Sequence, residues 1–322
     1  MGGVLLGVGI FSLSVGSAGI PFSKIVPLIL EGNGTTEYSI LFDIRLPRII
    51  LGFAVGGSLS IAGVILQGMF RNPLVEPYTL GISGGAALGV CLNIVLGLKH
   101  SVGILSIPLT GFLGAGIVIL MVYSLSIRKS ILKIQGLLLT GVMISFISSS
   151  LIMLIMAISR LEDLHGIVFW IMGSLGESNW LLIKITLLVS ILGLLVSYLF
   201  SMDLNAFSLG EEEALHLGIN IERTKKSLFI LASLLTGCSV AVGGVIGFVG
   251  LVVPHFVRMF VGPDHRILLA CSFLCGGTFL IFCDTLARTI ISPLELPVGV
   301  ITGILGGSLF VYALTRKGFS FL

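Results

Sequence analysis

Residues 45–86 read RLPRIILGFAVGGSLSIAGVILQGMFRNPLVEPYTLGISGGA, and the uncharged run 49–70 within them decides the class of fold. A helix that crosses a membrane needs about 20 consecutive, mostly apolar residues. The run has this length, and Arg48 and Arg71 stand at its two ends. The stretch therefore predicts a transmembrane helix over residues 48–70.

The composition of the whole chain is also strongly apolar. Of the 322 residues, 56% are hydrophobic and 10% are charged, whereas about a quarter of the residues in a soluble domain are charged. These values exclude a soluble enzyme and a disordered protein. The net charge of +3 is too small to indicate a nucleic acid or another polyanionic partner. The chain is predicted to be an integral membrane protein.

Further apolar segments bring the number of predicted spans to about ten. We therefore predict an all-α membrane protein with one transmembrane domain over residues 1–322. The predicted spans are 3–20, 48–70, 79–98, 102–127, 134–158, 180–201, 227–248, 250–260, 267–290 and 298–315.

The segment 250–260 is too short to cross a bilayer alone, and it contains Pro254, His255 and Arg258. Polar or broken helices at membrane depth are tolerated only where protein buries them or where they line a wet cavity. We expect this segment to be buried and to have a structural role at a gate, with ligand binding as the alternative.

The positions of the basic residues predict the orientation. With both termini in the cytoplasm, the inside segments hold the larger share of the 18 lysines and arginines, as the positive-inside rule requires. The longest loops are 21–47, 159–179 and 202–226. The last of these then lies inside, and none is large enough to form a soluble catalytic domain.

Glycines recur at four-residue spacing in several spans, and such faces let helix backbones approach closely. A translocation path lined by small residues is the functional alternative. The sets are Gly52 and Gly56; Gly81, Gly85 and Gly89; and Gly299, Gly303 and Gly307.

The chain contains no G-x-x-x-x-G-K-[ST] loop for nucleotide phosphates, so any ATP hydrolysis has to occur in another chain. One catalytic pattern does occur, since residues 81–85 fit G-x-S-x-G and resemble the GxSG of rhomboid intramembrane proteases. That function would need a histidine base for Ser83, and His255 is the candidate near membrane depth. A glycine-rich helix also produces this short pattern by chance.

Asp284 lies within a predicted span, four residues before Arg288. Residues at this spacing share a helix face, so the two side chains can form an ion pair. We favour an internal pair that orients Arg288. A cavity-facing carboxylate and a proton relay are the alternatives, and a relay would make the chain a proton-coupled secondary transporter.

Several short blocks follow one another along the chain: RLPR at 45–48, Gln67 with RNPLVEP at 71–77, LGISGGA at 80–86, WIMGSL at 170–175, LN and LG at 204–210, GFVGLVVPHFVR at 247–258, GPDHR at 262–266 and ELPVGVITG at 295–303. Taken in this order, the blocks resemble the permease subunits of binding-protein-dependent ABC importers for iron chelates, haem and cobalamin, the FecCD or BtuC-like type. Ser308 departs from the pattern of this family, because many members have proline there.

This resemblance implies a type II importer fold and a dimer, formed with a second copy or with a sister permease. It also implies two cytoplasmic ATPase subunits, an extracytoplasmic substrate-binding protein and a location in the inner membrane of a prokaryote. We expect no catalytic residue, cofactor or metal in this chain, because ATP and Mg²⁺ would bind to the ATPase. The expected cargo is an iron chelate of the siderophore type, with cobalamin or haem as alternatives.

Residues 203–219 are expected to be the segment that couples to the ATPase. Acidic residues suit the first turn of a helix, a glycine suits its end, and small apolar residues offer a contact surface. An interfacial loop on lipid headgroups is the alternative. The expected coupling residues are Leu209, Gly210, Glu211, Glu212, Glu213, Ala214, Leu217 and Gly218.

The resemblance also implies that Arg45, Arg48 and Arg288 lie at the outer surface and pair with glutamates of the binding protein. Arginine suits carboxylates because its planar fork donates two parallel hydrogen bonds. Snorkelling to lipid headgroups is the alternative. Structural or gating roles are expected for Asn72, Pro73, Pro254, His255, Arg258 and Asp284.

Overall fold

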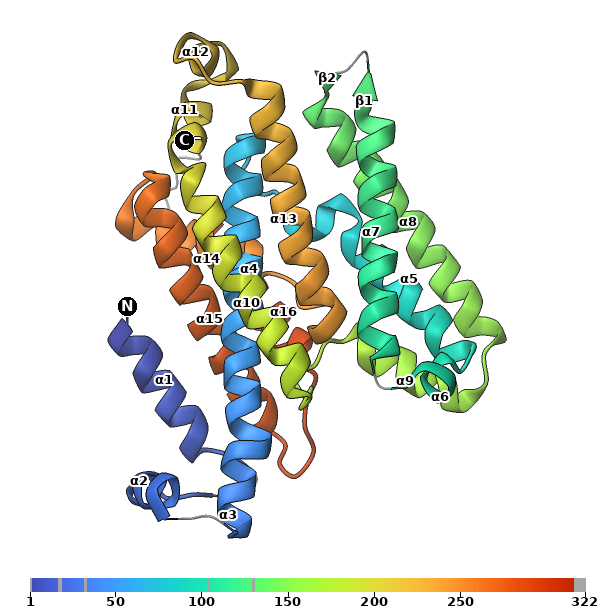
Figure 1. The fold of residues 1–322 in the computed structure, drawn as a ribbon, viewed down its shortest axis with the longest axis vertical. Helices are drawn as coiled ribbons and strands as arrows, with labels where there is room; N and C mark the ends of the chain where they lie inside the picture. The colour runs from blue at the N-terminus through green and yellow to red at the C-terminus, as the bar shows by residue number, and fades with distance from the viewer. Residues whose placement is uncertain (1, 17–18, 32–33, 104, 129–130, 316–322) are drawn as a thin grey trace.

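The computed structural model describes residues 2–16, 19–31, 34–103, 105–128 and 131–315, and these residues are almost entirely helical (Figure 1). The exception is a short antiparallel ladder in which β1 (Ile127–Arg128) pairs with β2 (Ile131–Leu132). The predicted all-α class is confirmed. Lys129, Arg316 and Lys317, which contribute to the predicted charge asymmetry, lie outside the described residues.

Within the described part of the chain, six helical segments are long and apolar enough to cross a membrane. Four shorter apolar helices complete the set, and together they correspond to the predicted spans. The long segments are Thr36–Phe70, which ends in α4 (Leu46–Phe70), α7 (Ser106–Ser126), α8 (Ile134–Ile158), α10 (Trp180–Leu199), α13 (Ile221–Gly243) and α15 (His265–Thr289); the short ones are α1 (Gly2–Ser14), α5 (Ile82–Val95), α14 (Val249–Val261) and α16 (Val298–Thr315).

The remaining helices are short and gather mostly at the two ends of the bundle (Figure 1). We call these ends the α12 end, which also carries β1 and β2, and the α2 end. The short helices are α2 (Phe22–Glu31), α3 (Thr36–Ser39), the π-helix η1 (Ile40–Arg45), the 3₁₀-helix η2 (Pro77–Leu80), α6 (Leu98–Val102), α9 (Leu161–Ile171), α11 (Ser201–Leu209) and α12 (Glu211–His216).

Helix α4 is the centre of the bundle, and it packs against α10, α13, α14 and α15. Its apolar stretch is 83% buried. Glycines make these close contacts possible: a Cβ atom at Gly56 would lie 2.3 Å from the carbonyl oxygen of Gly276 on α15. At Gly89 of α5 it would lie 2.3 Å from the Thr110 oxygen on α7. The predicted close packing is confirmed for these glycines, whereas a Cβ at Gly303 would contact nothing.

Several predicted spans have different boundaries in the structure, and the first of them, 3–20, ends at Ser14 in α1. Residues 79–98 do not form one helix, because Gly81 adopts φ +79° and separates η2 from α5. The chain has already turned back at the end of α4, and α5 begins about half-way along α7 (Figure 1). Helix α13 ends at Gly243 instead of reaching residue 248, since Gly244 adopts φ +70° and its Cβ would lie 2.4 Å from the Trp170 oxygen. The burial expected for the segment 250–260 is confirmed for residues 250–255 and for Val257 of α14, whereas Met259 and Phe260 are 54% and 79% exposed.

Candidate functional site

The segment expected to couple to an ATPase forms two short helices at the α12 end. Gly210 joins α11 to α12 with φ +124°, a conformation that suits glycine and strains other residues. Three glutamates occupy the first turn of α12, and Gly218 follows the helix with φ +83°. The predicted local structure is confirmed.

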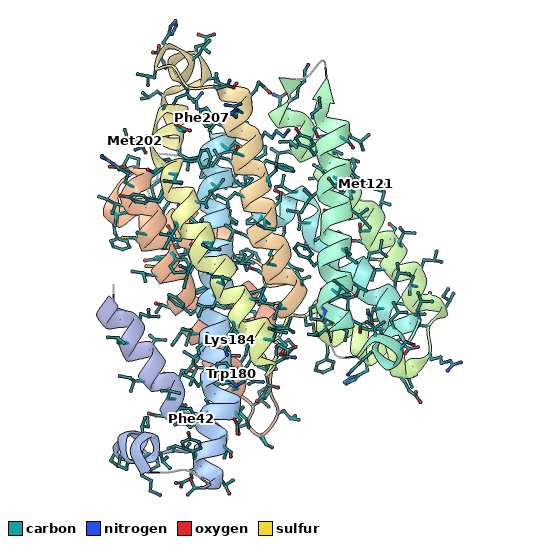
Figure 2. The ribbon with its side chains drawn as sticks, in the orientation of Figure 1. Phe42, Met121, Trp180, Lys184, Met202 and Phe207 are labelled. Atoms are coloured by element: carbon teal, nitrogen blue, oxygen red, sulfur yellow. The ribbon has the colours of Figure 1, made fainter. Side chains whose placement is uncertain are left out.

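This segment exposes apolar side chains on its outer side and buries one large side chain in the bundle. Leu209, Leu215 and Leu217 are 66%, 61% and 64% exposed. Phe207, in contrast, points from α11 into the bundle, while Met202 on the same helix points outward (Figure 2). We call the three exposed leucines the coupling surface.

The structure removes Ala214 from the expected contact surface. It is fully buried, so it cannot contribute to an exposed contact surface. It joins the main hydrophobic core, because α12 turns this face toward the bundle.

The coupling segment is tied to α13 by polar side chains. Lys225 Nζ lies 2.6 Å from Glu211 Oε2, and the lysine side chain is only 5% exposed. Thr224 Oγ1 donates to Asp203 Oδ2 at 3.3 Å. Glu211 therefore has an internal partner, which separates it from Glu212 and Glu213.

A second connection joins α11 to the start of α15 through Asn205. Its Oδ1 atom accepts from the backbone nitrogen of His265 and from His265 Nδ1, both at 2.8 Å. Its Nδ2 atom donates to Asp264 Oδ1 at 2.9 Å. Hydrogen bonds from Arg266 and from Asn205 hold the pKa of the Asp264 carboxyl well below its usual range. The sequence blocks LN and GPDHR contain these residues, but their spacing along the chain does not predict that they meet.

Replacing Asn205 by alanine is expected to lower the free energy of unfolding by about 1–3 kcal/mol, because it leaves the His265 donors without their acceptor. Thermal unfolding of the purified protein in detergent measures this effect. Ser208→Ala on the exposed side of α11 is the matched control, with an expected change within about 0.5 kcal/mol. Equal unfolding temperatures for the two variants would contradict the connection.

At the α2 end, two of the three expected docking arginines are buried, and their predicted exposure is wrong. Arg45 is 2% exposed and donates to the backbone oxygen of Leu13. Arg288 is 5% exposed and donates from Nη2 to Ser12 Oγ at 2.9 Å. Both guanidinium groups hold α1 against the bundle, so neither faces outward in this structure.

The predicted pair between Asp284 and Arg288 is confirmed. Arg288 Nε lies 2.9 Å from Asp284 Oδ2, and the two side chains are 5% and 8% exposed. Thr285 Oγ1 adds a hydrogen bond of 2.8 Å to Ser12 Oγ. The carboxylate thus serves an internal ion pair that fixes α1 on α15.

Arg48 is the expected docking arginine that stays near the surface. Its Nη2 atom lies 2.6 Å from Glu295 Oε2, and the side chains are 13% and 50% exposed. Glu295 was not expected to be its partner, although it begins the block 295–303 that contains the start of the last span. The Arg48 guanidinium therefore already forms an ion pair with an exposed carboxylate of the same chain.

Apart from Asp284 on α15, the expected structural or gating residues lie on α14 and on the turn after α4. Arg258 Nη2 donates to Gln67 Oε1 at 3.3 Å, and Gln67 Nε2 donates to the oxygens of Gly250 and Leu251. The His255 ring packs edge-on against Phe310 of α16, with centroids 5.7 Å apart. Pro254 lies inside the helix.

Asn72 shapes the turn that begins at Arg71, the left-handed residue with φ +50° that ends α4. Its Oδ1 atom accepts from the Leu74 nitrogen at 2.9 Å, which closes the turn around Pro73. The turn sends the chain back into the bundle toward η2.

Residues 4–316 match the FecCD transport family. The chain belongs to this family. It is 40% identical to the hemin transport system permease protein HmuU of Yersinia pestis, over 95% of this chain and 92% of that protein. It is 39% identical to the cobalamin import system permease protein BtuC of Halobacterium salinarum, over 95% of this chain and 82% of that protein. The solved structure of a metal-chelate type ABC transporter in an inward-facing conformation matches with 31% identity and a TM-score of 0.84, covering 98% of this chain and 96% of that one.

Membership of the FecCD family makes the chain a permease of the ABC importer class and a multi-pass membrane protein. The protease and proton-relay alternatives lose their support. Ser83 lies on α5, which packs on α7 and α8, whereas His255 lies on α14, which packs on α4, α15 and α16. Asp284 is engaged by Arg288.

Proposed function

We propose that this FecCD-family chain is the permease subunit of an ATP-driven importer, and that an iron chelate of the siderophore type crosses the inner membrane of a prokaryote through it. The observation that carries this proposal is the coupling surface, three exposed leucines on or directly after the short helices α11 and α12, which are bonded to α13 and to the start of α15. ATP and Mg²⁺ would bind to two partner ATPases at the α12 end, which then faces the cytoplasm together with both termini. A substrate-binding protein would dock at the α2 end, and a second permease would complete the pathway.

The likeness to a metal-chelate type transporter supports an iron chelate as the cargo. The likeness to hemin and cobalamin permeases, at 40% and 39% identity, supports haem as a second candidate and cobalamin as a third. The deciding experiment is uptake by a strain that lacks this chain, offered labelled ferric siderophore, haemin and cobalamin in parallel. Loss of ferric siderophore uptake alone is expected. Loss of haemin or cobalamin uptake alone would replace the iron-chelate proposal.

Serine at Leu209, Leu215 and Leu217 is expected to lower the amount of ATPase that co-purifies with the permease by about tenfold or more. The reason is that apolar side chains of this size each contribute about 1.5–3 kcal/mol when a partner buries them. Reversing the charge of Glu212 and Glu213 tests the acidic turn separately, because Glu211 is held by Lys225. Leu161→Ser, at an 83% exposed site on α9 at the α2 end, is the control. Undiminished ATPase content in the leucine variant would refute the docking role.

Arg48 is the residue that we propose for contact with the binding protein. Arg48→Glu is expected to abolish the stimulation of ATP hydrolysis by the loaded binding protein, because like charges then meet. The exchange Arg48→Glu with Glu295→Arg restores the internal ion pair but leaves position 48 negative. If the exchange restores stimulation, the pair has only an internal role and the docking assignment fails.

A further inference from the structure

Two loops that are far apart in the sequence meet between α4 and α14. Phe248 donates its backbone N–H to Glu76 Oε1 at 2.6 Å, across 172 positions of sequence. Two residues earlier, Ile246 donates its N–H to the Tyr78 hydroxyl at 3.0 Å. Glu76 and Tyr78 come from the segment around η2, and the residues they bind form the turn that precedes α14. We call Glu76, Tyr78 and this turn, residues 246–248, the α14 clamp.

The clamp holds a residue in an unfavourable conformation. Phe248 has φ +69°, in the left-handed region that aromatic residues rarely occupy. Such conformations persist only where the surroundings impose them, and they concentrate at functional sites. Phe248 is also the N-cap of α14, where the helix dipole favours a negative group, so the Glu76 carboxylate is well placed.

The left-handed backbone places the Phe248 side chain against α16. A Cβ atom built on Gly306 would lie 2.6 Å from Phe248 Cβ, and one on Gly307 would lie 3.7 Å from the ring. These two glycines therefore form the surface on which the phenylalanine rests. The conformation of one residue connects the start of α14 to α16.

The same end of α14 is joined to α4. Gln67 donates to the oxygens of Gly250 and Leu251, and Pro77 Cδ lies 2.7 Å from a Cβ position built on Gly250. The first turn of α14 is thus bonded or packed against α4, η2 and α16 at once. A helix held in this way moves only together with its neighbours.

We propose that Glu76 is a positioning residue for transport: by keeping Phe248 left-handed, it makes η2, α14 and α16 one rigid body while the importer changes state. The proposal rests on the proposed function as an ATP-driven importer. It assigns to RNPLVEP and GFVGLVVPH a shared task, because each block supplies one half of the clamp.

A double-mutant cycle tests the proposal in proteoliposomes that contain the permease, its ATPase and its binding protein. The readout is substrate transported per ATP hydrolysed. Glu76→Leu removes the acceptor and is expected to lower this ratio by about tenfold. Glu76→Gln keeps an acceptor oxygen and is expected to stay within about threefold of the wild type. Glycine adopts positive φ without support. In a Phe248→Gly background, Glu76→Leu is therefore expected to lower the transport ratio little further.

Two outcomes of the cycle overturn the proposal. One is additive losses from Glu76→Leu and Phe248→Gly, since independent sites add and coupled sites do not. The other is an equal loss for Glu76→Leu and Glu76→Gln, which would make the charge and not the hydrogen bond the important feature.

A distance measurement tests the rigid body without changing Glu76, so it remains decisive if Glu76→Leu does not fold. Spin labels are placed at the exposed positions Phe260 on α14 and Tyr312 on α16, in a variant without its five cysteines. The distance between the labels is expected to be the same with and without ATP. A distance that changes with nucleotide refutes the rigid body. This result depends on ATP and not on the cargo, so an error in the proposed substrate leaves it interpretable.

Discussion

Alanine at position 63 is expected to prevent the chain from reaching its native packing, with a loss of more than about 3 kcal/mol in the free energy of unfolding. A Cβ atom on Gly63 would lie 1.8 Å from the backbone oxygen of Gly250 and 2.6 Å from its carbonyl carbon. A side chain can rotate away from such a contact, but a backbone cannot. Relief therefore requires α4 and α14 to separate, although the core, Gln67 and the α14 clamp hold them together.

The yield and thermal unfolding of the detergent-solubilised protein measure this effect. Gly116→Ala on α7 is the matched control, since a Cβ there meets nothing within 4 Å. Alanine is also the better helix former by about 1 kcal/mol, so the control is expected to be neutral or slightly stabilising. A Gly63→Ala protein that unfolds at the wild-type temperature would show that the two helices are not packed as described.

Replacing Arg288 by methionine is expected to cost about 3–5 kcal/mol, because it leaves the Asp284 carboxylate buried without its partner. The change also removes the donor to Ser12, so α1 loses a bond that holds it on α15. We expect low yield and easier proteolysis near α1. The measurement is the unfolding temperature together with the rate of limited proteolysis.

The double variant Asp284→Asn with Arg288→Met separates charge from packing. It removes the uncompensated carboxylate and is expected to recover much of the loss. Lys24→Met is the control, since Lys24 and Glu37 form an exposed pair at 3.3 Å and such pairs contribute at most about 1 kcal/mol. An Arg288→Met variant as stable as the Lys24→Met control would contradict the buried pair.

The sequence by itself was sufficient for features that depend on near neighbours in the chain. Uncharged runs of about 20 residues predicted the spans, because a bilayer imposes that length on any helix that crosses it. The pair of Asp284 and Arg288 followed from their four-residue spacing. The form of α12 followed from its acidic first turn and from glycines at 210 and 218. Ordered blocks along the chain also predicted the family, which the match over residues 4–316 confirms.

Features that depend on how helices are rotated and placed against each other were decided only by the tertiary structure. Arg45 and Arg288 were expected to face outward, but the packing of α1 buries both. Ala214 was expected at a surface, but α12 turns it inward. The periodicity of a helix states which residues share a face and not what that face meets.

The contacts that join the functional segments have the same origin. Asn205 meets His265 across 60 positions, and Glu76 meets Phe248 across 172. No local pattern connects such residues, because each contact requires two helices to have a particular register. That register depends on close backbone contacts such as the one between Gly63 and Gly250. The sequence therefore determined the helices and their family, and the packing of those helices decided which polar groups meet.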